Sequence, residues 1–155
     1  MHEDVDEVTE AVLLASRVLV AVAVRSLAAA PADVTLPQYR ALVVLTSRGP
    51  QGAGTLADEL SVAPSSVTRL CDRLVAKSMV ERHLSPESRR EVEIAVTEQG
   101  AALVAAVTRA RRREVAKIVG AIPASRRSAL VRALQEFGAA AGEVPEQAWS
   151  LGWSQ

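Results

Sequence analysis

The feature that most constrains this 155-residue chain is a short amphipathic helix that we expect to begin at Pro64. Proline suits the first position of a helix, because its missing backbone N–H would have no partner there. Apolar side chains then recur at helical spacing and form one stripe that a core can bury: Val67, Leu70, Cys71 and Leu74. The opposite face carries small hydroxyls and then cations: Ser65, Ser66, Thr68, Arg69, Arg73 and Lys77.

This polar face has two interpretations on its own. It is either an ordinary solvated surface or a face that reads DNA, where small hydroxyls permit close approach to a groove and cations meet phosphates or guanine edges. A second short helix precedes it, and we expect Thr55 to cap that helix, with Asp58 completing a variant of the capping box. Two short helices joined by a tight turn form a helix-turn-helix.

A predicted hairpin follows and favours the DNA interpretation. Residues 79–84 and 91–96 are β-prone runs, and the second alternates apolar and other residues as a half-buried strand does. Arg89 and Arg90 fall at the tip between them. A protruding cation can enter the minor groove, whose negative potential is strongest where the groove is narrow. A hairpin that follows a helix-turn-helix is typical of a β-wing.

In this order, the motifs resemble those of the MarR family of bacterial transcription regulators. They are Leu56-Ala57-Asp58-Glu59-Leu60, Ser66-Val67-Thr68-Arg69-Leu70, Asp72-Arg73-Leu74, Val80-Glu81-Arg82, Arg89-Arg90 and Val96-Thr97-Glu98-Gln99-Gly100. The resemblance covers nearly the whole chain. It implies a mainly α fold with a small β-wing, a winged helix-turn-helix that dimerises through its N- and C-terminal helices. It also implies a repressor that a small phenolic or amphipathic ligand releases from DNA.

One departure from the family pattern concerns the wing. The family usually carries Asp two residues before its minor-groove arginine, and by that spacing the arginine is Arg90 and the Asp position is Ser88. A hydroxyl cannot pair with a guanidinium as a carboxylate does. Either the arginine is less preorganised in this chain, or Glu87 substitutes for the missing acid.

We therefore expect a double-stranded, palindromic operator as the partner of this chain. The base edges of the major groove are assigned to Ser65, Ser66, Thr68 and Arg69, the phosphates to Arg73 and Lys77, and the minor groove to Arg89 and Arg90. The distribution of charge agrees with this assignment. The whole chain has a formal net charge of zero, whereas residues 64–90 hold six basic and three acidic residues, a net of +3, and residues 1–33 hold two basic and six acidic residues, a net of −4.

The chain is long enough for one domain with a real core. We expect residues 34–96 to form the DNA-binding core, with the wing at 79–96, and residues 1–33 and 97–155 to supply the dimerisation helices and a tail. Helix 4–30 has more apolar surface than a small domain buries, which predicts a partner helix in a homodimer. Burial by the C-terminal helices of the same chain is the alternative.

Several finer expectations concern the flanking regions. Residues 49–54 are glycine-rich and are predicted to form a loop. The last helix, 125–141, is expected to turn four side chains inward: Leu130, Val131, Leu134 and Phe137. A basic cluster of Arg109 and residues 111–113 is expected to face the acidic N-terminal helix of the same or a partner chain. Trp149 and Trp153 predict a tail that docks its indoles on the body or on a second subunit.

A ligand pocket is expected where helix 4–30, helix Leu36–Ser47 and helix Thr97–Val119 meet. Arg17, Tyr39 and Arg40 are its polar candidates. The alternative is that small aliphatic side chains fill this space and that the chain is a constitutive regulator with no ligand. Aromatic residues make up only 3% of the chain, which favours that alternative.

Other classes of function find little support in the sequence. No Cys/His/Asp/Glu cluster has metal-ligand spacing and no serine stands in a nucleophile-elbow sequence, so we expect no cofactor, no metal and no enzyme. Cys71 is the only cysteine and lies on the apolar stripe, which favours a buried structural thiol over a redox sensor. The apolar run Val18–Val24 is too short for a membrane span, and a cytoplasmic protein is expected. The remaining rival is a dimeric winged-helix module that binds a protein partner and not DNA.

Overall fold

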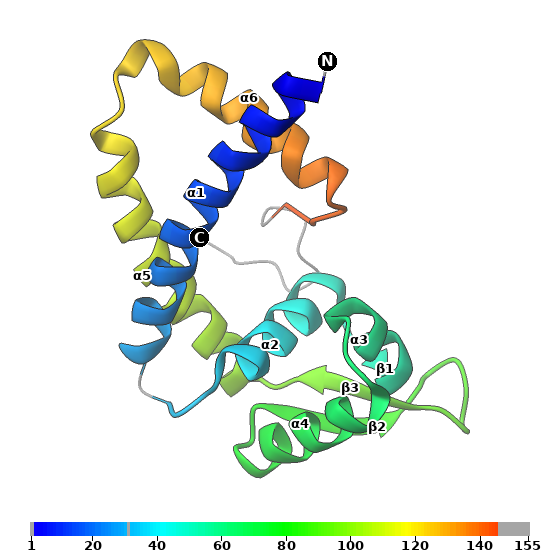
Figure 1. Cartoon of the computed structure of the whole chain (residues 1–155). Helices are drawn as coiled ribbons and strands as arrows, with labels where there is room; N and C mark the ends of the chain where they lie inside the picture. Colours follow the sequence, from blue (N-terminus) through cyan, green and yellow to red (C-terminus); the bar gives the residue numbers. More distant parts are fainter. Residues whose placement is uncertain (1, 31, 146–155) are drawn as a thin grey trace.

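The computed structural model describes residues 2–30 and 32–145. It consists of a compact head and of long helices that extend from it (Figure 1). In chain order the elements are α1 (His2–Ala28), α2 (Leu36–Arg48), β1 (Gln51–Gly52), α3 (Ala53–Leu60), α4 (Pro64–Ala76), β2 (Val80–Leu84), β3 (Val92–Val96), α5 (Glu98–Gly120) and α6 (Ala124–Ala140). The predicted fold class, mainly α with a small β-wing, is confirmed. The tail with Trp149 and Trp153 lies outside the described residues.

The core of the head is built around α2. Nearly every residue of this helix from Gln38 to Ser47 is buried, and its leucines meet fully buried side chains of α3 and α4 such as Leu56, Val67 and Leu74. A capping box begins the helix, in which the Thr35 hydroxyl accepts from the Gln38 N–H and the Gln38 side-chain oxygen accepts from the Thr35 N–H. Burial on all sides explains why α2 has a weak amphipathic pattern.

The sheet has three strands in the order β1-β3-β2, all antiparallel. Strand β1 lies in the segment 49–54 that was predicted to be a loop. Its two residues, Gln51 and Gly52, pair with β3 but are too few to show the alternation of apolar and polar residues that marks a strand in a sequence. The pairing leads directly into α3, so Gly52 and not Thr55 is the residue before the helix, and the predicted Thr55 cap is wrong. On β3, Ile94 is buried whereas Val92 is exposed, because the hairpin extends beyond the head there.

The apolar surfaces of α1 and α6 are left uncovered. No residue of α6 is buried, and Val131, Leu134 and Phe137 each expose more than half of their surface. The prediction that they face the interior of the chain is therefore wrong for a single copy, where only Leu130 is half-buried. Helix α1 packs against α5 along its second half (Figure 1), yet Leu14 is 59% exposed.

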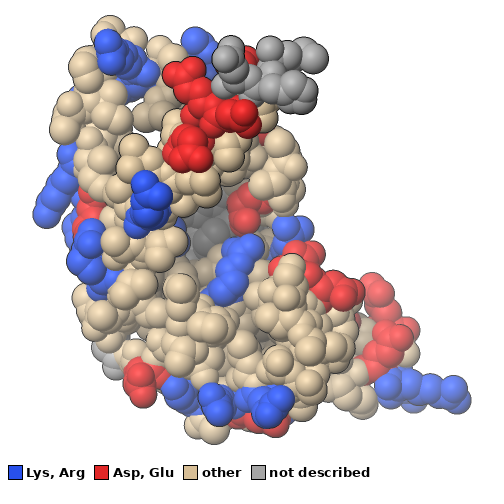
Figure 2. Space-filling model, in the orientation of Figure 1, with Lys and Arg blue, Asp and Glu red and all other residues tan. Residues whose placement is uncertain are grey.

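The ion pair between α1 and α5 differs from the expected one. Arg25 of α1 donates to Glu114 of α5 at 2.7 Å, so the base lies on α1 and the acid on α5. The prediction that the α5 arginines face the acidic residues of α1 is not met by this contact. The acidic side chains gather toward the outer end of α1 (Figure 2).

Helix α1 is long and apolar enough to cross a membrane, by length and composition only. Its segment Asp4–Ala28 has a mean hydropathy of 1.9 in the most apolar window, of which 17% is buried. The Val18–Val24 run considered above is thus part of a longer apolar stretch. A helix whose apolar face packs on a second subunit has the same composition.

A tight junction joins the head to α5. The Thr97 N–H donates to the Met79 carbonyl at 3.0 Å, the Thr97 hydroxyl donates to the Ser78 carbonyl at 2.7 Å, and the same hydroxyl accepts from the Gly100 N–H at 3.1 Å. A Cβ atom on Gly100 would lie 2.2 Å from the Met79 carbonyl oxygen. Only glycine therefore fits here, and the cap predicted at Thr97 is confirmed.

This junction predicts a specific stability effect. In the Gly100→Ala variant the added methyl group forces the backbone at Met79 or at the start of α5 to move. We therefore expect its free energy of unfolding, measured by urea denaturation, to fall by about 1–3 kcal/mol. Gly54→Ala is the matched control, because Gly54 lies in α3 with open space around its Cα, and its stability should stay equal or rise by about 0.5 kcal/mol. Equal stability of the two alanine variants would contradict the tight junction.

Candidate nucleic-acid interface

Helix α4 presents one face to the core and the other to solvent. Helix α3 ends at Ser61 in the left-handed conformation (φ 54°), and after a short turn α4 begins at Pro64, as predicted. Val67, Cys71 and Leu74 are buried. The buried stripe predicted from the sequence is thus confirmed for these three residues, while Leu70 is half-buried.

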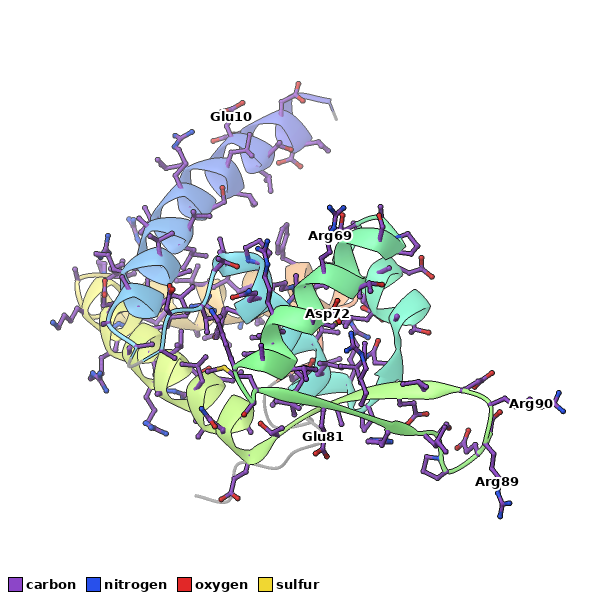
Figure 3. All side chains as sticks on the ribbon, turned by 90° about the horizontal axis from the view of Figure 1, so that it is seen from below. Glu10, Arg69, Asp72, Glu81, Arg89 and Arg90 are labelled. Carbon is purple, nitrogen blue, oxygen red and sulfur yellow. The ribbon has the colours of Figure 1, made fainter. Side chains whose placement is uncertain are left out.

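The opposite face of α4 gathers most of the predicted DNA-contacting residues. Those exposed together on this face are Ser65, Ser66, Thr68, Arg69 and Arg73. Arg69 projects from the helix away from the core (Figure 3). The Thr68 hydroxyl donates to the Pro64 carbonyl at 3.2 Å, so it offers a lone pair and a methyl group to a groove. These residue types match base edges and phosphates.

Lys77 differs from the other cations of α4. It is half-buried, and its ammonium donates to the Asp33 carbonyl and, at 3.5 Å, to the Gln38 side-chain oxygen. Both acceptors belong to the segment that connects α1 with α2 and begins α2. The structure therefore places Lys77 apart from the exposed cations, and its phosphate contact stays a prediction.

The wing tip is a compact turn that carries two free-standing arginines. The Ser85 N–H donates to the Glu91 carbonyl at 2.8 Å, and the buried Ser85 hydroxyl accepts from the Glu87 N–H at 3.3 Å. Arg89 and Arg90 point away from the body (Figure 3). None of the ion pairs found within residues 2–30 and 32–145 involves Arg90, so Glu87 does not replace the missing family Asp in this structure.

An ion pair that the sequence did not predict connects α4, the second helix of the helix-turn-helix, to the wing. Arg82 of β2 donates to Asp72 of α4 at 2.6 Å. Ten residues separate the two in sequence, so no helical or strand spacing indicates the contact. Beside this pair, burial raises the pKa of the Cys71 thiol. The positive charge of Arg82 lowers this pKa by a smaller amount, and the negative charge of Asp72 raises it further. A thiol that is buried and protonated fits the structural role predicted for Cys71.

The surface charge follows the same geometry. In Figure 2, basic side chains gather along the lower edge of the head and at the end of the wing. In Figure 3, Asp72 lies on α4 between Arg69 and the strands of the wing, and Glu81 lies on β2, away from the two arginines of the wing tip. The cations thus form separate contact points and not a continuous basic patch, which favours a defined register on DNA over indiscriminate binding.

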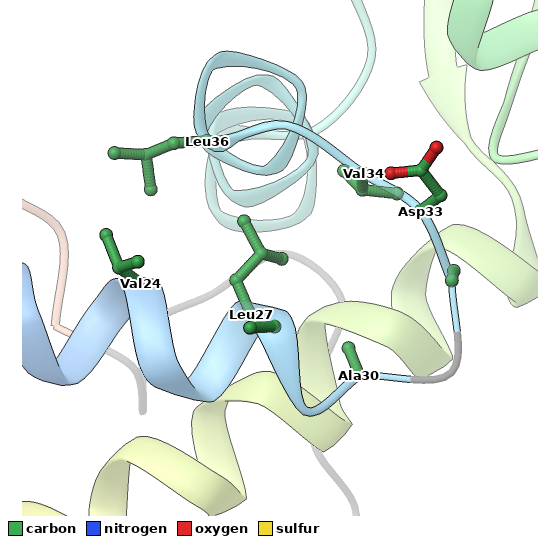
Figure 4. A pocket seen from close by; sticks show the side chains of 8 residues that line it. Val24, Leu27, Ala30, Asp33, Val34 and Leu36 are labelled. Carbon is green, nitrogen blue, oxygen red and sulfur yellow. The ribbon is translucent and has the colours of Figure 1, made fainter.

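Two of the three predicted ligand-contacting residues line one pocket. Tyr39 and Arg40 of α2 border a space of about 540 Å³ together with residues of α5 and with Glu143. Arg40 also pairs with Glu143 at 3.4 Å. Arg17 is exposed on α1 and does not line this pocket. A separate apolar pocket of about 550 Å³ lies between the end of α1 and the start of α2, with Asp33 on its wall (Figure 4).

Comparison with known proteins places this geometry in a family. The family model described as MarR matches residues 34–92, which hold the helix-turn-helix and most of the wing. An uncharacterized HTH-type transcriptional regulator of Mycobacterium bovis is 35% identical over 112 residues, or 72% of this chain and 78% of the relative. A shorter match, to a regulator of Bacillus subtilis, spans 48% of that relative.

Solved structures agree over nearly the whole chain. The crystal structure of RV1404 from Mycobacterium tuberculosis is 44% identical, covers 91% of this chain and 96% of its own, and superposes with a TM-score of 0.84. A MarR family protein from Bacillus stearothermophilus shares the fold at a TM-score of 0.81, with 22% identity and coverage of 92% and 99%. Together with the exposed face of α4 and the arginine-tipped wing, these matches show that the chain belongs to the MarR family of DNA-binding transcription regulators, which are not enzymes and which function as dimers.

Proposed function

We propose that this regulator is a homodimer that reads a palindromic operator with α4 in the major groove. The observation that carries the proposal is the exposed polar face of α4, on which Ser65, Ser66, Thr68 and Arg69 meet base edges and Arg73 meets phosphate. Arg89 and Arg90 reach the adjacent minor groove from the wing. In this assignment residues 34–96 are the reading head of a single 155-residue domain.

The second subunit accounts for the uncovered apolar surfaces. Helices α1 and α6 expose large aliphatic side chains and Phe137. A symmetric interface buries these patches against their own copies and sets two α4 helices about 34 Å apart, one turn of DNA. In this arrangement α1 is an interface helix of a cytoplasmic protein and not a membrane span.

Regulation by a small ligand extends the proposal. The multiple antibiotic resistance protein MarR of Salmonella typhimurium is 34% identical over 47% of this chain and 51% of the relative, and its name refers to antibiotic resistance. The pocket beside Tyr39 and Arg40 lies between α2 of the head and the long α5. A ligand that binds there with different affinity in two head positions shifts the spacing of the α4 helices and releases a repressor from DNA.

DNA binding by two variants of α4 tests which residues read bases and which contact phosphates. We expect Arg69→Ala to reduce the discrimination between a selected operator and random DNA by about 1–3 kcal/mol, because a base contact is lost. The Arg73→Ala variant should bind the operator and random DNA more weakly by the same factor. The slope of log affinity against log salt should decrease in magnitude by about 0.9. Fluorescence anisotropy over a salt series measures both quantities. Unchanged discrimination by Arg69→Ala would remove the base-reading assignment.

The dimer gives a second prediction. Leu134→Glu introduces a charge into the exposed apolar face of α6 and should convert the dimer to a monomer at micromolar concentration in analytical ultracentrifugation. Val62→Glu is the matched control, because Val62 is also an exposed aliphatic residue but lies in the turn between α3 and α4. A wild-type monomer, or a dimer that both variants retain, would exclude α6 from the interface.

The ligand proposal is tested by operator affinity with and without salicylate and a set of amphipathic acids. We expect an active compound to weaken operator binding and to raise the melting temperature of the free protein, because it stabilises one head position. Arg40→Ala should lose both responses while its operator affinity without ligand stays within a few-fold of wild type. If no compound changes either quantity, the chain is a constitutive regulator.

A further inference from the structure

Among the predicted DNA-contacting cations, all of which lie in the described part of the chain, Lys77 is the one whose side chain donates to two acceptors. It follows directly on α4 as its C-terminal cap residue, and its side chain is half-buried. The ammonium donates to the backbone carbonyl of Asp33 and lies 3.5 Å from the side-chain oxygen of Gln38. Arg73 and Arg69, about one and two turns earlier on the helix, are exposed.

The two acceptors belong to the hinge region between the dimerisation helix and the head. Asp33 lies in the connection between α1 and α2 and forms part of the wall of the apolar pocket with Val24 and Leu27 of α1 (Figure 4). Gln38 is 3% exposed, and its side-chain oxygen also accepts from the Thr35 N–H at 3.1 Å in the capping box of α2. The Lys77 ammonium therefore connects the end of α4 with the α1–α2 connection and the start of α2.

The chemistry of these contacts favours a structural link over a phosphate contact. An ammonium has three donors and no acceptor, and its hydrogen bonds to carbonyl oxygens are charge-assisted and stronger than neutral ones. Two of the three donors are already used in the structure, so a phosphate at Lys77 must share the ammonium with both acceptors or displace one of them. If it displaces the buried Gln38 side chain, that side-chain oxygen loses a charged donor that solvent cannot easily replace.

We propose that Lys77 is a positioning residue that fixes the orientation of the recognition helix relative to α1. In a dimer held together partly by α1, this link sets the separation and the relative rotation of the two α4 helices. It thereby determines which spacing of operator half-sites the protein accepts. The inference rests on the proposed dimeric operator binding.

The test compares two operators. The first is selected from random DNA by the wild-type protein, and the second is the same sequence with one base pair inserted between its half-sites. In Lys77→Met, which keeps the length of the side chain and removes its donors, we expect the preference for the first operator to fall about fivefold to tenfold. The salt slope of binding should equal that of wild type, because no phosphate contact is lost.

Three further variants separate positioning from other roles. Lys77→Arg keeps a cationic donor and should restore most of the spacing preference. Gln38→Met removes one of the two acceptors while leaving the cation at position 77, and it should reduce the spacing preference in part with an unchanged salt slope. Arg73→Met should instead lower the salt slope by about 0.9 and keep the spacing preference. Melting curves of each variant verify that it is folded.

The outcomes are distinct. A salt slope that falls by about 0.9 in Lys77→Met, with the spacing preference retained, would overturn the inference and assign Lys77 to a phosphate. If Lys77→Met does not fold, Gln38→Met decides by the same two readouts. If the wild-type protein selects no DNA sequence, the proposed function fails before the role of Lys77 is reached.

Discussion

The close approach of Gly100 to the Met79 carbonyl is the contact on which the geometry of this regulator depends. It lets the first turn of α5 lie directly on the backbone that joins α4 to the wing, where Thr97 adds hydrogen bonds to Ser78 and Met79. A side chain at position 100 would push α5 away from the head. Because the same few residues end the recognition helix, begin the wing and start the long helix, movement of one requires movement of the others.

The head and the long helices are stabilised in different ways. The head has a complete aliphatic core around α2, with Leu42, Leu45 and Leu56 fully buried, and needs no second copy. Helix α6 buries no residue, and α1 buries Val22 and Leu27 but leaves most of its other large aliphatic side chains exposed, which the single chain does not cover. In the proposed dimer, stability of the long helices is therefore coupled to protein concentration.

Sequence patterns predicted the elements that follow a simple rule and failed where tertiary contacts decide. The stripe of Val67, Cys71 and Leu74 and the cap at Thr97 are local, so their spacing alone was sufficient. Strand β1 is too short to show a period in the sequence. It leads directly into α3, which therefore begins at Ala53, before the predicted cap at Thr55. The family resemblance supplied the ordered motifs, but neither the hydrogen bonds of Lys77 nor the Asp72–Arg82 pair has a spacing that a sequence displays.

The connections between the head and the long helices differ in strength, which restricts how a ligand can act. The Gly100 contact and the bonds of Lys77 involve buried or half-buried groups that resist displacement. The pair Arg40–Glu143 joins α2 to the segment after α6 at 3.4 Å, with about half of each side chain exposed, and such pairs contribute little stability. Arg40 and Glu143 also line the pocket beside Tyr39. In the proposed regulation, a ligand there meets the Arg40–Glu143 pair first. The Gly100 contact keeps the head attached to α5, and Arg48, which donates to the Gly142 carbonyl at 2.9 Å, keeps α2 joined to the segment after α6.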